Sequence, residues 1–236
     1  MRVYKNLVGL REDWGGKLVL CSGPGCAQTG VPAAVNIAGG TTLAVDSDAA
    51  AMKSAMRAGI LDFVVNTLDE ALRTLKNEIR QERPLGVGLI SNVEPALAEM
   101  VERGLQPDLQ LVHFLPKMDQ GMTNSQAETL CARGMPQRQV LSEDDDFDGR
   151  PVDTRQLLYH KPHDEYFFRA ADSAGLRGID ATLLAGLPAD DIVRRRWLER
   201  VPKYLREARS GGRWTWLSDE ELESLAARGF SPVPQP

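Results

Sequence analysis

The sequence has few cysteines, no excess of basic residues and no long apolar run. Its 236 residues contain only three cysteines, Cys21, Cys26 and Cys131, too few for the disulfide framework of a secreted domain. Their spacing also lacks the paired pattern of a zinc site, so we predict no metal. Sparse, unpaired cysteines are typical of a reducing compartment, and we expect a cytoplasmic protein.

Other absences narrow the range of partners. No segment approaches the roughly 20 apolar residues of a membrane span, and residues 1–5 lack the apolar region of a secretory signal. With 28 basic and 33 acidic residues, the formal net charge is −5, which argues against a general affinity for nucleic acid or an anionic membrane. We therefore expect a small-molecule ligand, with neither nucleic acid nor membrane as a partner.

What the sequence does contain, up to about residue 115, is a regular alternation of short strands and amphipathic helices. Predicted strands are 18–21, 42–45, 62–65, 86–90 and 109–114, and predicted helices are 33–37, 49–58, 68–80 and 94–103. This alternation predicts a Rossmann-like α/β fold for residues 1–115, with a mostly parallel sheet and helices on both faces.

Residues 116–231 lose this rhythm and are predicted to form a helix-rich α+β lid or appended subdomain, followed by a loose tail at 232–236. We expect strands at 140–141 and 152–159 and helices at 164–173, 188–208 and 217–228, the last opened by a capping box at Ser218. The basic run Arg194–Arg196 is predicted to be a solvated helix face, and the acidic run 142–149 a solvated turn.

A candidate ligand site follows the first strand. The strand ends in a turn of small residues that holds Gly23 and Gly25, and the second strand closes on an acid, Asp46. In a βαβ unit such a turn lets backbone N–H groups approach a phosphate, while the acid accepts hydrogen bonds from a ribose diol. A third glycine is missing, and the alternative is that the glycines only turn the chain and the acid is a helix N-cap.

Residues 22–109 resemble the NAD-binding domain of the urocanase (urocanate hydratase) family without a gap. The matching segments are Ser22–Pro32, Val45–Asp48, Gly59–Asp62, Leu68–Leu72, Pro84–Leu89, Asn92 and Arg103–Asp108. The resemblance implies an NAD-binding Rossmann-like domain in a homodimeric protein related to lyases. The contacts that it implies for the cofactor come from Ser22, Gly23, Gly25, Cys26, Ala27, Gln28, Asp46 and Asn92.

The chain also departs from this family. Where urocanases carry Gly-Met-Gly, it has Cys26-Ala27-Gln28, whose side chains we expect to fill space that the backbone needs for a pyrophosphate. Asp46 replaces a glutamate, and Ala51 replaces an arginine, which removes a charge-assisted contact. Residues 113–117 share none of the polar groups of the family's Gln-Thr-Ser-Ala-His segment, and the family's catalytic cysteine has no counterpart here. We therefore predict that the chain is not itself a urocanate hydratase.

Two residues are candidates for catalysis. Cys26 leads into a helix N-terminus, a setting that lowers the pKa of a thiol, and the alternative is a small residue tolerated in a tight turn. His113 ends the fifth strand, at the sheet edge where α/β proteins bind ligands. His160 and His163 are open to a ligand-binding role or to a strand end and helix start around Pro162.

Two functions stay open at this point. The first is an enzyme or relic enzyme that binds NAD or a related nucleotide at the glycine turn. The second is a non-catalytic scaffold or small-molecule-binding protein with a remodelled cofactor groove.

Overall fold

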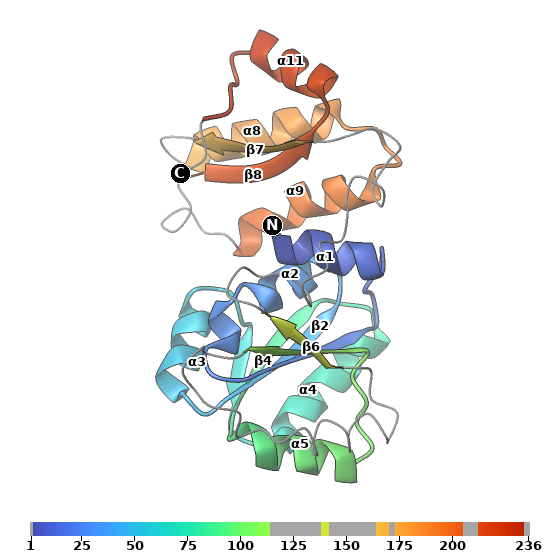
Figure 1. The fold of residues 1–236 in the computed structure, drawn as a ribbon, viewed down its shortest axis with the longest axis vertical. Helices are drawn as coiled ribbons and strands as arrows, with labels where there is room; N and C mark the ends of the chain where they lie inside the picture. Colours follow the sequence, from blue (N-terminus) through green and yellow to red (C-terminus); the bar gives the residue numbers. More distant parts are fainter. Residues whose placement is uncertain (1, 114–137, 142–163, 170–172, 205–211, 234–236) are drawn as a thin grey trace. The chain divides into compact units, whose positions relative to one another are not determined.

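The structure is a computed structural model that describes residues 2–113, 138–141, 164–169, 173–204 and 212–233. The chain divides into two compact units, residues 2–151 and residues 152–236 together with Met1. We refer to them as the N-terminal unit and the C-terminal unit and describe each by itself (Figure 1). No helix among the described residues is long and apolar enough to span a membrane.

The N-terminal unit contains a six-stranded sheet in which every described pairing is parallel. Its strands are β1 (Leu18–Ser22), β2 (Thr41–Asp46), β3 (Phe63–Val65), β4 (Leu85–Ile90), β5 (Leu109–His113) and β6 (Arg138–Leu141). Their spatial order is β3-β4-β2-β1-β5-β6. The parallel Rossmann-like sheet predicted from the alternating pattern is confirmed. Because β6 pairs with β5, the N-terminal unit extends beyond the boundary predicted at residue 115.

Helices cover both faces of this sheet: α1 (Arg2–Leu10), α2 (Val31–Ala38), α3 (Ala49–Arg57), α4 (Leu68–Arg80) and α5 (Val93–Glu102). On one face, Val87 and Leu89 of β4 pack in the apolar core beneath α4 and α5. On the other face, a Cβ at Gly88 would lie 2.8 Å from a methyl carbon of Leu61 and 3.3 Å from Met52 of α3. Glycine therefore allows this close approach, and a Cβ there would require the side chains of Leu61 and Met52 to shift.

The first helix, α1, has no counterpart among the predicted elements. Tyr4 and Leu7 on this helix are fully buried, and the indole N–H of Trp14 donates to the carbonyl oxygen of Leu7 at 2.9 Å. The helix is therefore an integral part of the N-terminal unit, although no capping residue in the sequence predicts where it begins.

The order of the strands places a topological switch point beside β1. From β1 the chain moves to β2 on one side and later returns to β5 on the other side. Ser22, the last residue of β1, pairs with Val112 near the end of β5. Ligands of open α/β sheets bind in the crevice outside the carboxyl ends of strands at such a point.

The C-terminal unit pairs two antiparallel strands with three helices among its described residues. The strands are β7 (Asp164–Arg169) and β8 (Gly212–Leu217), and the helices are α8 (Ser173–Gly186), α9 (Ile192–Tyr204) and α11 (Asp219–Ala227). The helix predicted at 164–173 is wrong over β7. Asp164 pairs with Leu217 as a strand residue, and the aromatic run Tyr166–Phe168 suits a strand once β8 supplies the backbone partner.

The helices expected near 188–208 and 217–228 are present with shorter bounds. Ser218 forms the predicted capping box with Glu221, with both reciprocal hydrogen bonds made. The predicted strand at 140–141 is also found, as part of β6. The predictions for 142–149 and 152–159 lie outside the described residues.

Charged residues are buried in the C-terminal unit, against the prediction of a solvated basic run. Arg194 is only 3% exposed and bonds Asp191 and Glu221. Arg195 donates to the carbonyl oxygens of Leu184 and Leu187, where α8 ends. A helix leaves its last carbonyls without internal partners, and Arg195 satisfies two oxygens of this terminal region.

The second buried ion pair yields a test of stability. Arg213 of β8 donates to both carboxylate oxygens of Asp180 on α8, at 2.7 and 2.8 Å, and both side chains are buried. We expect Asp180→Asn to destabilise the C-terminal unit by about 3 kcal/mol, because it leaves the guanidinium buried without its counter-ion.

Urea denaturation of the full chain, followed by tryptophan fluorescence, measures this effect. Arg177→Gln on the same helix is the control, since Arg177 is exposed, and it should change stability by less than about 0.5 kcal/mol. Equal effects of the two substitutions would contradict a structural role for the buried pair.

Candidate functional site

The turn between β1 and α2 is built on glycines in the left-handed backbone region. Gly23 has φ 110°, Gly25 has φ 75° and Gly30 has φ 79°. Gly25 opens the short 3-10 helix η1 (Cys26–Gln28), and Gly30 caps the N-terminus of α2. These conformations are strained for residues with a Cβ, so the glycines at these positions are dictated by the shape of the turn.

Asp46, at the end of β2, holds this turn. Its Oδ2 accepts a hydrogen bond of 2.6 Å from the N–H of Gly25, and its Oδ1 accepts one of 2.9 Å from the N–H of Asp48. The side chain is only 2% exposed. The helix N-cap role that sequence analysis left open falls to Asp48, which accepts from the N–H groups of Ala50 and Ala51. The side chain of Asp46 therefore does not cap α3, and it holds the turn instead.

Cys26 and Ala27 are fully buried beneath the turn. The Sγ of Cys26 lies 3.5 Å from the carbonyl oxygens of Cys21 and Val45, and the Sγ of Cys21 lies 3.5 Å from the carbonyl oxygen of Cys26. The expectation that both side chains occupy the path of a pyrophosphate is thus corrected, because they point into the core. This enclosure does not suit a nucleophile that has to reach a substrate.

Burial also affects the neighbouring thiol. Its hydrogen bond with Cys26 and its burial together raise the pKa of the Cys21 thiol well above the usual value. A raised pKa keeps the group protonated and unreactive at neutral pH. Cys21 therefore serves the core of the sheet.

Three of the expected cofactor residues offer polar side chains around the turn. Ser22 is fully buried, and its Oγ has no hydrogen-bond partner in the described part of the chain. Gln28 is exposed, and its Oε1 lies 3.9 Å from the position that a Cβ on Gly25 would take. Asn92 is the exposed N-cap residue of α5 and makes no side-chain capping hydrogen bond. Their roles toward a ligand stay predictions.

Asn92 is brought to this edge by the pairing of β2 with β4. Asp46 pairs with Ile90, and the N–H of Ser91 donates to the carbonyl oxygen of Asp46 at 3.1 Å. The glycine turn, Asp46 and the start of α5 thus follow three strands that end at the same edge. The parallel sheet assembles this set although its members are far apart in sequence.

His113 ends β5 at the same edge, one residue after the Val112 that pairs with Ser22. The position of its backbone agrees with the expectation, while its side chain lies outside the described structure. Residues 114–117, Cys131, His160 and His163 also lie outside the described residues. Within the described residues, no group of three His, Cys, Asp or Glu side chains is arranged to hold a metal ion.

Backbone hydrogen bonds occupy much of the turn itself. The N–H groups of Gly23, Cys26 and Gln28 donate to the carbonyl oxygens of Val45, Gly23 and Gly25, at 3.2, 3.1 and 2.8 Å. The first turn of α2 carries the next backbone donors, although its residues are buried. There Val31 donates to the hydroxyl of Thr29 and Pro32 has no N–H, which leaves the N–H of Ala33, a residue that is 4% exposed.

Comparison with known protein families gives one match. Residues 2–112 match the family model of the urocanase Rossmann-like domain. The match begins at α1 and ends within β5, so it includes the glycine turn, Asp46 and Asn92. It also includes α1, which sequence analysis missed, and it stops short of β6 and the C-terminal unit.

The structure predicts that Asp46 stabilises the N-terminal unit. Asp46→Asn should lower the free energy of unfolding by about 1–3 kcal/mol, because an amide N–H₂ would face one of the two backbone donors and leave it unsatisfied. Asp48→Asn is the matched control, since asparagine caps a helix as well as aspartate does. Urea denaturation measures both, and a neutral Asp46→Asn would contradict the buried hydrogen bonds.

The structure also predicts slow thiol chemistry at the turn. In a Cys131→Ser background, Cys21 and Cys26 should react with an aromatic disulfide reagent only as fast as the protein unfolds, because neither side chain is exposed. Comparison of the rates with and without denaturant, at neutral pH, makes the test. Rapid labelling of Cys26 in the native protein would restore it as a candidate nucleophile.

Proposed function

We propose that residues 2–112, which match the family model of the urocanase Rossmann-like domain, bind NAD or a related adenine nucleotide at the turn Ser22–Gln28. One observation is the main support for this proposal. Asp46 lies in hydrogen-bond contact with Gly25, so the acid expected to accept a ribose and the turn expected to hold a phosphate form one assembled unit.

The residues present fit such a ligand. A carboxylate oxygen that accepts one backbone N–H retains a second lone pair, and Asp46 can therefore also accept a ribose hydroxyl. The Oγ of Ser22, unpartnered among the described residues, is an unsatisfied polar group at the switch point, and the side chains of Cys26 and Ala27 are buried. The first turn of α2 offers backbone N–H and the positive end of the helix dipole to a pyrophosphate.

In this proposal the side chain of Gln28 contacts the ligand. It is exposed next to Gly25, and a primary amide can donate to a phosphate oxygen or accept from a ribose hydroxyl. Asn92, at the N-terminus of α5, has the same capacity on the other side of Asp46. NAD, when bound, supplies an electrophilic nicotinamide ring, and the residues named here bind and orient it.

We propose further that the chain is not a urocanate hydratase. The family match covers the Rossmann-like domain alone. Ala51 stands where the family has an arginine, and Cys26 of the turn is enclosed. An enzyme built on this domain would have to take its substrate-binding groups from residues outside the match.

A specific observation favours a second candidate, a non-catalytic domain with a closed groove. The N–H groups of Gly23, Gly25 and Cys26 are already bonded within the protein, and the Gln28 amide lies over Gly25. In that case Asp46 serves only to hold the turn. The two candidates differ in whether NAD binds at all.

Isothermal titration of the full chain with NAD, and separately with AMP, tests the proposal. We expect micromolar binding of NAD and weaker binding of AMP, which retains the adenosine and one phosphate. Gln28→Ala should weaken NAD binding about five- to tenfold through the loss of one hydrogen bond, and this exposed substitution should leave stability unchanged.

Asp46→Asn should weaken the binding of both ligands by about tenfold or more. This titration is made without denaturant, at a temperature at which the variant is folded. Asp48→Asn should bind as the wild type does. If the wild type shows no binding at millimolar NAD and AMP, the proposal is rejected and the non-catalytic domain with a closed groove is favoured. Tighter binding by Gln28→Ala would show that Gln28 blocks the groove instead of contacting the ligand.

A further inference from the structure

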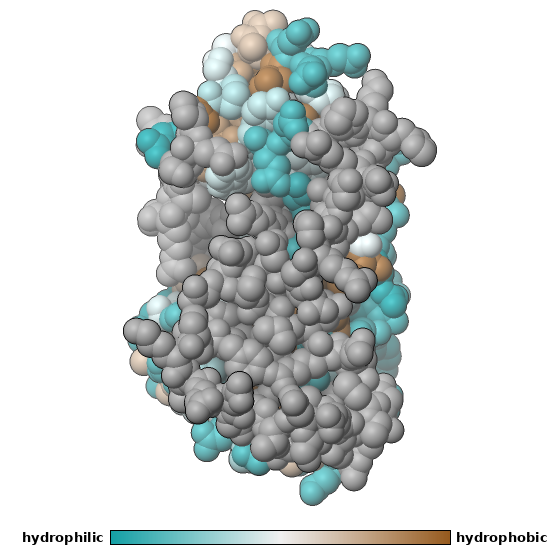
Figure 2. Space-filling model, viewed as in Figure 1, coloured by the Kyte–Doolittle hydropathy of each residue, from teal (hydrophilic) through white to brown (hydrophobic). Residues whose placement is uncertain are grey.

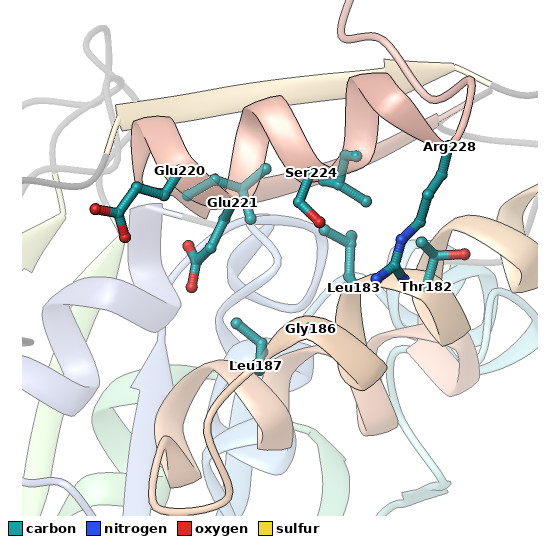
Figure 3. A pocket seen from close by; sticks show the side chains of 10 residues that line it. Thr182, Leu183, Gly186, Leu187, Glu220, Glu221, Ser224 and Arg228 are labelled. Atoms are coloured by element: carbon teal, nitrogen blue, oxygen red, sulfur yellow. The ribbon is translucent and has the colours of Figure 1, made fainter.

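The C-terminal unit contains a pocket that lies outside the family match. It has a volume of about 220 Å³ and opens between α8 and α11 (Figure 3). Its floor is apolar, formed by the buried side chains of Leu183, Leu187, Leu217 and Leu225. The volume is below the roughly 300–1,000 Å³ of sites for drug-sized ligands, so an occupant would be small.

One end of the pocket carries hydrogen-bond donors. Ser224 on α11 and Arg228, the C-cap residue that follows this helix, are four residues apart, and Figure 3 shows both side chains extending toward α8. Arg228 makes no ion pair with any described residue. Thr182 of α8 faces them, and its hydroxyl oxygen can still accept although its proton is given to the carbonyl oxygen of Gly178.

The pocket is also lined by two carboxylates, those of Glu220 and Glu221. Glu221 is held by Arg194, at 2.7 and 2.9 Å, and also accepts from the N–H of Ser218, so its charge is neutralised within the protein. Glu220 lies at the far end of α11 from Arg228 (Figure 3). The Arg228 end is therefore the positive end of the pocket, while acidic groups at the other end disfavour a second negative charge on the occupant.

We propose that this pocket binds a small monocarboxylate with an apolar body. The carboxylate would accept charge-assisted hydrogen bonds from Arg228 and a hydrogen bond from Ser224, and the apolar chain would cover the four leucines. Figure 2 shows brown apolar and teal polar surface side by side at the top of the view, in the region where Figure 1 draws α11.

Gly186 provides a sharp test because it lines the pocket and a Cβ added there would meet nothing within 4 Å. Its φ is not in the left-handed region, so Gly186→Leu fits the backbone and places a side chain into the open space. Gly178 on the same helix is the matched control, since its Cβ would also meet open space and it does not line the pocket.

The probe is hexanoate, titrated into the ¹⁵N-labelled full chain and followed by amide chemical shifts, with hexylamine and hexan-1-ol as probes of the same length. We expect saturable shifts at α8 and α11 with hexanoate, and binding at least about tenfold weaker for the amine and the alcohol. Gly186→Leu should abolish the hexanoate shifts, and Gly178→Leu should retain them.

Arg228→Gln, an exposed substitution, should weaken hexanoate about tenfold and leave hexan-1-ol unchanged. It keeps the test decisive if Gly186→Leu fails to fold. Absence of saturable shifts up to about 10 mM hexanoate overturns the proposal, as does wild-type affinity in Gly186→Leu. Equal binding of hexylamine and hexanoate overturns the assignment of Arg228 as the carboxylate-binding group.

Discussion

The hydrogen bond from the N–H of Gly25 to the carboxylate of Asp46, 2.6 Å long, is the constraint on which the candidate site depends. A carboxylate that is 2% exposed needs donors in place of the water it has lost, and here two backbone N–H groups supply them. The first of these donors belongs to a residue with φ 75°, which glycine adopts without strain. The identities of Gly25 and Asp46 are therefore coupled, and the register between the β1 turn and the end of β2 follows from their contact.

Local pattern was sufficient to predict most of the N-terminal unit. The strands β1 to β5 and the helices α2 to α5 lie within a few residues of their predicted positions, because each carries its own apolar period and the Rossmann-like connections are short. The direction of Cys26 could not be predicted in this way. Its side chain points inward because η1 turns tightly after Gly25, and a 3-10 turn of three residues has too little periodicity to show which side is buried.

In the C-terminal unit, sequence patterns predicted one secondary-structure element and one side-chain environment wrongly. The segment Asp164–Arg169 becomes a strand because β8, which follows α8 and α9 in the chain, supplies its hydrogen bonds. Likewise, the run Arg194–Arg196 reads as solvated until Asp191 and Glu221 are placed around Arg194. In both cases the deciding interaction is tertiary, so propensity and charge pattern favoured the wrong environment.

The two units neutralise their buried charges by different means, and this difference affects what each can bind. Asp46 is held by neutral backbone N–H donors at the sheet edge, and its carboxylate suits hydroxyl groups and not a second anion. In the C-terminal unit, Asp180 and Glu221 are paired with arginines. The pair with Arg194 neutralises Glu221, a carboxylate that lines the same pocket as Arg228 and would otherwise offset its charge. The positive end of the small pocket thus follows from this ion pair, not from any local excess of basic residues.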